Sequence, residues 1–336
     1  IRDKMKDGGL KMKLIIQIPC YNEEATLQIA LDDLPKKIEG IDIIEYLIIN
    51  DGSKDKTVEV AKNWGVHYIV NFKRNKGLAY GFMAGIDACL RNDADIIVNT
   101  DADNQYSGKD IEKIVRPILE GKSDIVIGSR PIDETEHFSP LKKKLQHIGS
   151  RTVQIASNTD IPDAPSGFRA YSRDAAMRLN VFNEYTYTLE TIVQAGREKI
   201  AMTSVPIHTN EELRPSRLFH SMFGYVKRSS ITIIRAFMMY KPLRFFTILG
   251  TIPLAIGIII GIRYLFFLGM GVSGGHVQSL ILASILILMG FMTIIIGLQA
   301  DIIAANRKIL QDVQYRVRKM EYDIESNKKG VHNKEV

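Results

Sequence analysis

Short apolar runs and amphipathic stretches alternate along the first two thirds of the chain. Apolar runs of about four to eight residues between turn signals are typical of buried strands, whereas a 3.6-residue period is typical of helices. The predicted strands are Leu14–Ile18, Ile44–Asn50, His67–Phe72, Ala94–Thr100 and Ser123–Gly128. The predicted helices are Glu24–Leu34, Thr57–Trp64 and Leu78–Arg91. This alternation predicts an α/β domain over residues 13–215, with a mostly parallel, Rossmann-like sheet and helices on both faces.

Two much longer apolar runs follow this region. The 61 residues from Leu243 to Ile303 contain three charged side chains, although 24% of the whole chain is charged. Within them, 245–268 and 277–300 are each 24 residues long. A helix of that length spans about 36 Å, and a bilayer's hydrocarbon core is about 30 Å thick. Residues 243–303 are therefore predicted to form a hairpin of two transmembrane helices.

Basic residues flank both predicted spans on the same side. Those before the first span are Lys227, Arg228, Arg235, Lys241 and Arg244, and those after the second are Arg307, Lys308, Arg316, Arg318 and Lys319. The link 269–276 has no Lys or Arg. Because cytoplasmic flanks carry the excess of basic residues, we expect a multi-pass membrane protein whose α/β domain and both termini lie in the cytoplasm.

Three further segments complete the predicted organisation. Residues 1–12 form an N-terminal extension, and 216–242 mix apolar with basic positions, which favours amphipathic helices lying on membrane lipids. Residues 304–336 form a cytoplasmic C-terminal helix and tail, with apolar positions at a 3-4-3-4 spacing: Leu310, Val313, Val317, Met320 and Ile324. Two heptads of this kind fit either a homo-oligomer or packing on a neighbouring element.

Composition excludes several classes of protein. The net charge of +6 and the pI near 9.1 are too mild to indicate nucleic-acid binding. Two cysteines, Cys20 and Cys89, exclude a disulfide framework and the four-cysteine zinc sites. The chain has neither a G-x-x-x-x-G-K-[ST] loop nor a G-x-G-x-x-G turn after a strand, which argues against a common ATPase and a dinucleotide oxidoreductase.

Polar side chains follow each of the five predicted strands. They lie in 19–24, 51–55, 73–77, 101–105 and 128–130. In parallel α/β sheets ligands bind beyond the carboxyl ends of the strands, so these segments are expected to converge on one site. Asp101 and Asp103, with the amide of Gln105, are oxygen ligands that suit Mg²⁺ or Mn²⁺ shared with substrate phosphates. Nearby cations that can neutralise phosphate charge are Lys76, Arg130, Arg214 and Arg217.

The motifs PCYNEE, INDGSKDKT, NKGLAYG, TDADNQY, IGSR and PSGFRAYSR occur in this order. With them the chain resembles family 2 glycosyltransferases of the GT-A fold, in the branch of dolichol-phosphate mannose synthases and other polyisoprenyl-phosphate glycosyltransferases. The resemblance covers residues 13–217, and the predicted membrane hairpin extends it to about 303. It implies a GT-A catalytic domain.

The resemblance also implies residue roles. The implied nucleotide-sugar site is formed by Pro19, Tyr21, Asn22, Glu23, Asp51, Lys76, Asp101 and Asp103. The implied metal ligands are Asp101, Asp103 and Gln105, and the implied acceptor or phosphate ligands are Arg130, Arg169, Arg214, Ser216 and Arg217. The implied catalytic residues are Asp103, Arg130 and Asp163. Asp163 takes the place of a general base in relatives, but a turn residue between Pro162 and Pro165 explains it equally well.

The expected function is a membrane-bound hexosyltransferase. It would move one sugar, with inversion, from a UDP- or GDP-hexose to polyprenyl or dolichyl phosphate, giving a lipid-linked sugar for glycan or glycoprotein assembly. Two alternatives are a processive polysaccharide synthase and a non-catalytic membrane scaffold that binds nucleotide-sugars. Processive synthases typically carry a Q-x-x-R-W motif, which this chain lacks, since its only Trp is Trp64. A non-catalytic scaffold is disfavoured because Asp101 and Asp103 are both intact.

Overall fold

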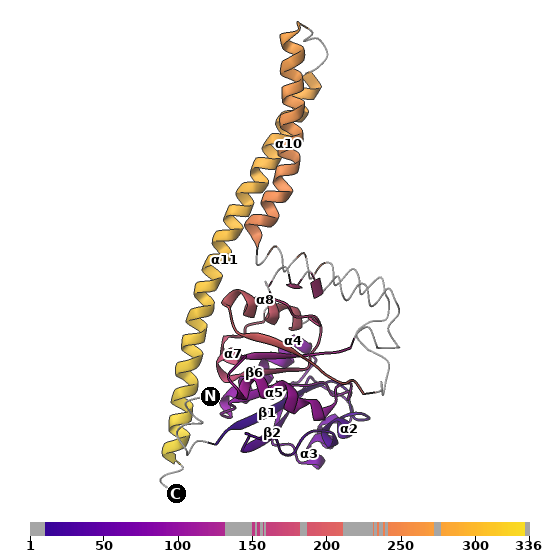
Figure 1. Cartoon of the computed structure of the whole chain (residues 1–336), viewed down its shortest axis with the longest axis vertical. Helices are drawn as coiled ribbons and strands as arrows, with labels where there is room; N and C mark the ends of the chain where they lie inside the picture. The colour runs from indigo at the N-terminus through magenta and orange to yellow at the C-terminus, as the bar shows by residue number, and fades with distance from the viewer. Residues whose placement is uncertain are drawn as a thin grey trace. The chain divides into compact units, whose positions relative to one another are not determined.

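The computed structural model describes residues 11–131, 159–181, 187–210, 241–271 and 277–332, with single residues or pairs between 150 and 157 and at 231, 234 and 238 (Figure 1). Two compact units make up the chain. One is Ile1–Ser229 together with Asp312–Val336, and the other is Ser230–Gln311.

A mixed sheet forms the centre of the first unit. Its strands are β1 (Lys13–Cys20), β2 (Ile43–Asn50), β3 (Tyr68–Asn71), β4 (Ile96–Asn99), β5 (Ile125–Ser129), β6 (Arg169–Ser172) and β7 (Met202–Pro206). Their order in the sheet is β3-β2-β1-β4-β6-β5-β7. β6 runs antiparallel to both neighbours and the other pairs are parallel. The predicted, mostly parallel sheet is confirmed, and β6 and β7 complete it.

The sheet is covered on both faces. Successive side chains of a strand point to opposite faces of the sheet. Leu14, Ile15 and Ile16 of β1 are consecutive and have no exposed surface, so both faces are covered there, and the same holds for β4. The helices of this unit are α2 (Leu27–Asp32), α3 (Thr57–Trp64), α4 (Leu78–Arg91), α5 (Ile111–Leu119), α7 (Arg173–Arg178) and α8 (Thr188–Glu198), and a 3-10 turn η1 (Gly108–Asp110) precedes α5.

Helix α4 lies unusually close to the sheet because of its glycines. A Cβ added to Gly85 would lie 2.3 Å from the Gln17 side-chain oxygen and 2.8 Å from Ile49 Cδ1. A side chain at this position would therefore push the helix away from β1 and β2. The loop between β3 and α4 lies at the carboxyl edge of the sheet, because β3 runs parallel to β2 and β1.

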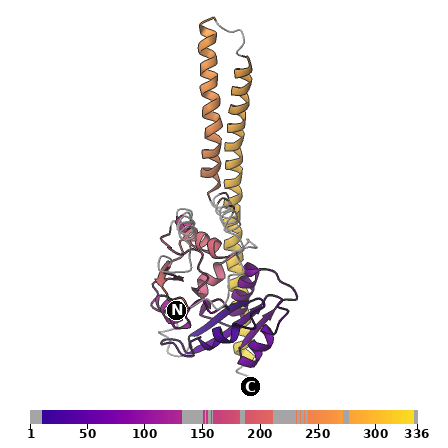
Figure 2. The same ribbon diagram turned by 90° about the vertical axis from the view of Figure 1, so that its right-hand side faces the viewer.

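The second unit is a helical hairpin of α10 (Pro242–Gly269) and the first part of α11 (Val277–His332). The two helices run side by side in both views (Figures 1 and 2). They approach closely at Gly250 and Gly290, where a Cβ on either residue would lie 2.7 or 2.6 Å from the other's carbonyl oxygen. Small residues at such a crossing are typical of helices packed in membranes.

Both hairpin helices are long and apolar enough to cross a membrane, and little of their surface is buried within the chain. For example, Ile259 is 66% exposed and Leu288 is 59% exposed. The second predicted span and the predicted C-terminal helix form one continuous helix, α11. Most of the predicted interfacial segment 216–242 lies outside the described residues.

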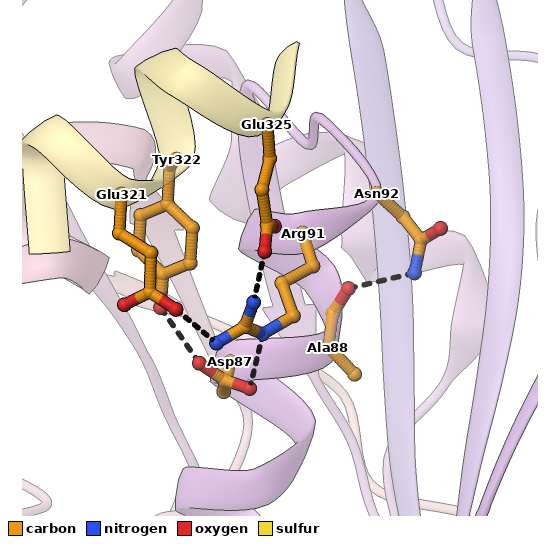
Figure 3. Close-up of polar contacts among 7 residues, drawn as sticks. All are labelled: Asp87, Ala88, Arg91, Asn92, Glu321, Tyr322 and Glu325. Carbon is orange, nitrogen blue, oxygen red and sulfur yellow. Dashed lines mark hydrogen bonds and ion pairs between the residues drawn. The ribbon is translucent and has the colours of Figure 1, made fainter. Parts of the chain in front are cut away.

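The C-terminal part of α11 packs on α4 in the first unit (Figure 3). Tyr322 is 2% exposed, and its hydroxyl donates a hydrogen bond of 2.8 Å to Asp87. Arg91, next to Asp87 on α4, forms ion pairs with Glu321 and Glu325. The tail of α11 is therefore an integral part of the unit that contains the sheet.

Candidate active site

The loop after β4 and the loop before β6 meet at the carboxyl edge of the sheet. A Cβ added to Gly167 would lie 3.3 Å from Asp101 Oδ2 and 3.0 Å from the Tyr187 hydroxyl. A side chain at this position would press on both oxygens, so glycine suits the close approach of this backbone to the carboxylate. The antiparallel course of β6, between β4 and β5, brings Gly167 here, because Arg169 at the start of β6 is paired with Asn99 at the end of β4.

The second aspartate of the predicted metal motif lies in a rigid turn. Asp103 accepts a hydrogen bond of 3.1 Å from the backbone N–H of Gln105, and Asn104 between them is left-handed, with φ of 58°. Asn210, beyond β7, donates to the carbonyl of Asn104 and, through its backbone, to that of Gln105. The side chains of Asp103 and Gln105 stay partly exposed on this supported loop.

A buried ion pair lies beside this loop. Arg130 donates from Nε to Asp163 Oδ2 (2.7 Å) and from Nη2 to Oδ1 (3.0 Å), and its backbone N–H also reaches Oδ2 (3.2 Å). The Asp163 side chain is fully buried and that of Arg130 is 11% exposed. Both carboxylate oxygens are thus bonded to one arginine, an arrangement that favours a charged pair. A general-base role for Asp163 stays a prediction, and in this geometry the carboxylate orients Arg130.

Charges and hydroxyls cluster around the pair. Burial lowers the pKa of Arg130, but the Tyr106 hydroxyl, Asp163 and Asp101 outweigh it, so the pKa is raised and the guanidinium stays charged. Burial raises the pKa of Tyr106 to about 12, with contributions from Asp101 and Asp163 that oppose that of Arg130. The charge of Asp101 thus favours the charged form of Arg130, and the roles predicted for the two residues stay predictions.

Arg169 has a different environment from Arg130. It is fully buried and donates to the carbonyls of Ser166 and Ala164 (both 2.8 Å) and to the Thr191 hydroxyl (2.7 Å). Its guanidinium holds the loop that contains Asp163 and Gly167. The contact with an acceptor that the resemblance implies for Arg169 stays a prediction.

The predicted donor side is held together by Asp51, at the end of β2. Its carboxylate accepts the backbone N–H groups of Lys76 (2.7 Å) and Gly77 (2.9 Å), and the residue is 6% exposed. The exposed ammonium of Lys76 lies over the rings of Phe72 (4.8 Å) and Tyr80 (4.6 Å). Asp51 thus positions the loop that presents Lys76 at the N-terminus of α4.

The segment after β1 is bonded to the segment after β2. The backbone N–H of Asn22 donates to the Ser53 hydroxyl (2.9 Å), and its side-chain oxygen accepts from the backbone N–H of Lys54 (2.9 Å). The backbone N–H of Glu23 donates to Thr57 (2.8 Å), and Glu23 is 7% exposed. Pro19 is partly buried and Tyr21 is 39% exposed. An open pocket of about 420 Å³ adjoins this segment, lined by Asn22, Glu24, Ala25, Lys54 and Asp55.

Sequence analysis missed a buried polar network beneath the site. Asn99 donates to the carbonyl of Gly167 (2.9 Å) and to the Tyr187 hydroxyl (2.8 Å), and accepts from Gln17 (2.9 Å). The Tyr187 ring stacks on Phe82 of α4, with 3.9 Å between ring centroids. Amides inside apolar strands, in LIIQIP and IIVNT, were the available signal, because buried amides need hydrogen-bond partners.

The remaining predicted site residues belong to the loop at 214–217 and to the metal site. Arg214, Ser216 and Arg217 lie outside the described residues. Within the described part of the chain, no three His, Cys, Asp or Glu side chains are grouped closely enough to hold a metal ion by themselves. The oxygen donors of Asp101, Asp103 and Gln105 fit a hard cation that takes its remaining ligands from water and phosphate.

Comparisons with known proteins identify the family of the domain. The profile of Glycosyl transferase family 2 matches residues 15–179. An uncharacterized protein of Methanocaldococcus jannaschii is 33% identical over 204 residues, which cover 59% of this chain and 82% of that protein. The UDP-N-acetylglucosamine–dolichyl-phosphate N-acetylglucosaminyltransferase of Methanococcus voltae is 29% identical, over 57% of this chain and 83% of that enzyme. The undecaprenyl-phosphate mannosyltransferase of Micrococcus luteus is 25% identical, over 63% and 90%.

Solved structures show the same fold. Glucosyl-3-phosphoglycerate synthase from Mycobacterium tuberculosis, crystallised with Mn²⁺, UDP and phosphoglyceric acid, superposes with a TM-score of 0.53. The superposition covers 70% of this chain and 80% of that one, at 17% identity. The sheet unit is therefore a GT-A-like domain.

Proposed function

The chain belongs to glycosyl transferase family 2, and we propose that it moves one hexose from a UDP- or GDP-sugar to polyprenyl or dolichyl phosphate. The observation that carries this proposal is the position of Asp101 beside Gly167 at the carboxyl edge of the sheet, together with the buried Arg130–Asp163 pair, in a chain with two membrane-length helices. Relatives whose names specify dolichyl or undecaprenyl phosphate as acceptor support the lipid.

In the proposed complex, the donor lies along the edge formed by the first four strands. Pro19, Tyr21, Asn22, Glu23 and Asp51 would surround the nucleoside, and Lys76 would approach the diphosphate. Asp51 and Glu23 are largely buried, so they would also hold the backbone around the base. Asp101, Asp103 and Gln105 would hold Mg²⁺ or Mn²⁺, which when bound stabilises the negative charge of the leaving nucleoside diphosphate.

The acceptor would approach from the side of Arg130. A phosphate monoester is already an anion near neutral pH, so its oxygen needs little help from a base to attack the sugar. In a one-step inverting transfer, that oxygen forms the new bond to C1 while the bond from C1 to the diphosphate breaks. Arg130, oriented by Asp163, would position the acceptor phosphate, so catalysis depends on orientation and charge more than on proton transfer. Arg169, Arg214, Ser216 and Arg217 remain the other proposed acceptor ligands.

The proposed location is the cytoplasmic face of a membrane crossed by α10 and α11. The basic flanks support this orientation. A site held at the bilayer surface meets a lipid phosphate in the membrane and a donor dissolved in water.

The test is a transfer assay on the purified full-length chain in detergent, with a short polyprenyl phosphate, Mg²⁺ or Mn²⁺ and a panel of UDP- and GDP-sugars. We expect mass spectrometry to detect one glycosyl-phospholipid from one donor. Asp103→Asn should lower the rate at least about 100-fold. Glu59→Gln, the same change of charge on the exposed face of α3, should leave it unchanged. Donor binding without lipid product across the panel would refute the proposal.

A further inference from the structure

The tail of α11 has two faces of opposite character. One face contacts the sheet unit through polar side chains. Arg318 donates to the carbonyl of Leu179 (2.7 Å), and Tyr315 donates to Asp174. The residues of this docked face are Gln314, Tyr315, Arg318, Glu321, Tyr322 and Glu325. The apolar positions take no part in these hydrogen bonds and ion pairs.

The apolar positions form a separate stripe that is exposed to solvent. Val313, Val317, Met320 and Ile324 are 50%, 51%, 59% and 55% exposed, and Leu310 at the start of the stripe is 68% exposed. We call these five residues the seam. Their 3-4-3-4 spacing puts them on one side of a helix, as the a and d positions of heptads. An exposed apolar stripe of this regularity indicates an interaction surface.

Neither the sheet unit nor the hydrocarbon core accounts for the seam. Its residues from 313 onward belong to the sheet unit and are exposed there. The last long apolar run ends at Ala300, and four charged residues separate it from Val313: Asp301, Arg307, Lys308 and Asp312. Charged side chains are expensive in hydrocarbon, so the seam lies beyond the bilayer core.

We propose that the seam binds the same seam of a second copy of this chain, as a short parallel coiled coil. Two of the three a positions, Val317 and Ile324, are β-branched, which is typical of a positions in two-stranded parallel coiled coils. The charges beside the seam are complementary in this arrangement. Arg316, at a g position, meets Glu321 of the partner subunit at the following e position. Within its own chain Glu321 binds Arg91 through Oε1, but its side chain is 46% exposed, so the carboxylate can accept a second cation. This attraction occurs twice by symmetry.

The membrane strengthens this pairing. Two copies inserted in one bilayer, as proposed above, send their α11 helices out of the same face in the same direction, so a parallel arrangement follows. Confinement raises the effective concentration of one tail near another, and a seam of five positions can then associate although it would be weak between separate peptides. Of the proposed function, this inference uses only the membrane orientation.

The test is disulfide trapping in the full-length chain reconstituted in lipid vesicles. Val317→Cys and Met320→Cys place a thiol at an a and a d position, and Lys319→Cys is the matched control on an exposed position outside the seam. The native Cys20 and Cys89 are buried and are present in all three variants, so they contribute equally to any cross-linking. Under mild oxidation, both seam variants should form covalent dimers at least ten times faster than the control. Equal rates at all three positions would overturn the proposal.

A second measurement separates the seam from contacts elsewhere in the membrane. Adding Arg316→Glu to Val317→Cys places like charges opposite each other and should slow trapping several-fold. The mass of the detergent-solubilised protein should correspond to two chains of 37.9 kDa, and to one chain after Val317→Glu with Met320→Glu. Both residues are exposed, so these changes should leave the fold intact. A dimer that persists in the double variant would refute the seam as its interface, whether or not the chain transfers sugar.

Discussion

At the sheet edge and in the helical hairpin, glycine lets the backbone come close to other atoms, but the surroundings differ. Gly167 faces the Asp101 carboxylate and the Tyr187 hydroxyl, inside a network that reaches Asn99 and Gln17. Gly250 and Gly290 face each other between two apolar helices whose outer surfaces are exposed.

This difference predicts different sensitivities. At the sheet edge, buried polar atoms depend on particular partners, so losing one partner leaves another atom unsatisfied. In the hairpin, close approach depends on volume, so a larger side chain of any polarity has the same effect. The site should therefore respond to changes of hydrogen bonding or charge at constant size, and the hairpin to changes of size.

The largest effect on stability is expected at the buried ion pair. Arg130→Met leaves the Asp163 carboxylate buried without its partner and should lower the free energy of unfolding by about 3–5 kcal/mol. Arg130→Met combined with Asp163→Leu should recover much of this loss but no transfer activity. Thermal denaturation in detergent measures the stability of each variant, and the transfer assay measures its activity. A double variant no more stable than the single one would contradict the account.

The network below the site should show the next largest effect. Asn99→Leu keeps the side-chain size but removes the amide that donates to the Gly167 carbonyl and the Tyr187 hydroxyl, and leaves these two atoms with the longer hydrogen bond of 3.3 Å between them. We expect a loss of about 2–3 kcal/mol in unfolding free energy and a slower transfer, since the loop beside Asp101 is no longer held. Denaturation curves and transfer rates of this variant test the network directly. Unchanged values for both would show that the network is dispensable.

In the hairpin, size should matter more than polarity. Gly290→Leu introduces a side chain where a Cβ already lies 2.6 Å from the Gly250 carbonyl, and should destabilise the helix pair by about 1–2 kcal/mol. Gly261→Leu is the matched control on α10, because nothing lies within 4 Å of its added Cβ. Thermal denaturation of both variants in the same detergent makes the comparison. Equal losses would mean that the glycine contact does not set the helix spacing.

The smallest effect is expected at the ion pairs between α4 and the α11 tail. Arg91, whose side chain is 38% exposed, pairs with Asp87, Glu321 and Glu325 in contact with solvent. Arg91→Met should therefore lower the free energy of unfolding by less than about 1 kcal/mol. The difference from the parent should shrink further at high salt, because salt screens exposed charges. A loss as large as that of Arg130→Met would contradict the distinction between buried and exposed pairs.

Local patterns predicted the elements that depend on local chemistry. The bounds of α3 and α4 agree with the predicted Thr57–Trp64 and Leu78–Arg91, because amphipathic periods and turn residues define them. The first five strands and both long apolar helices were also expected. Helix α2 is shorter than the predicted Glu24–Leu34, since the backbone of Glu23 and Glu24 is bonded to the segment after β2.

The sequence by itself determined which residues are apolar, which strand ends are polar and where long helices form, since these follow from neighbours along the chain. Only the tertiary structure decided that β6 enters between β4 and β5, that Asp163 pairs with Arg130 at a separation of 33 residues, and that Gly167 meets Asp101. Strand order and side-chain pairing depend on contacts between distant segments. The seam shows the same division, because its period is visible in the sequence but its exposure follows from the polar face that docks on α4.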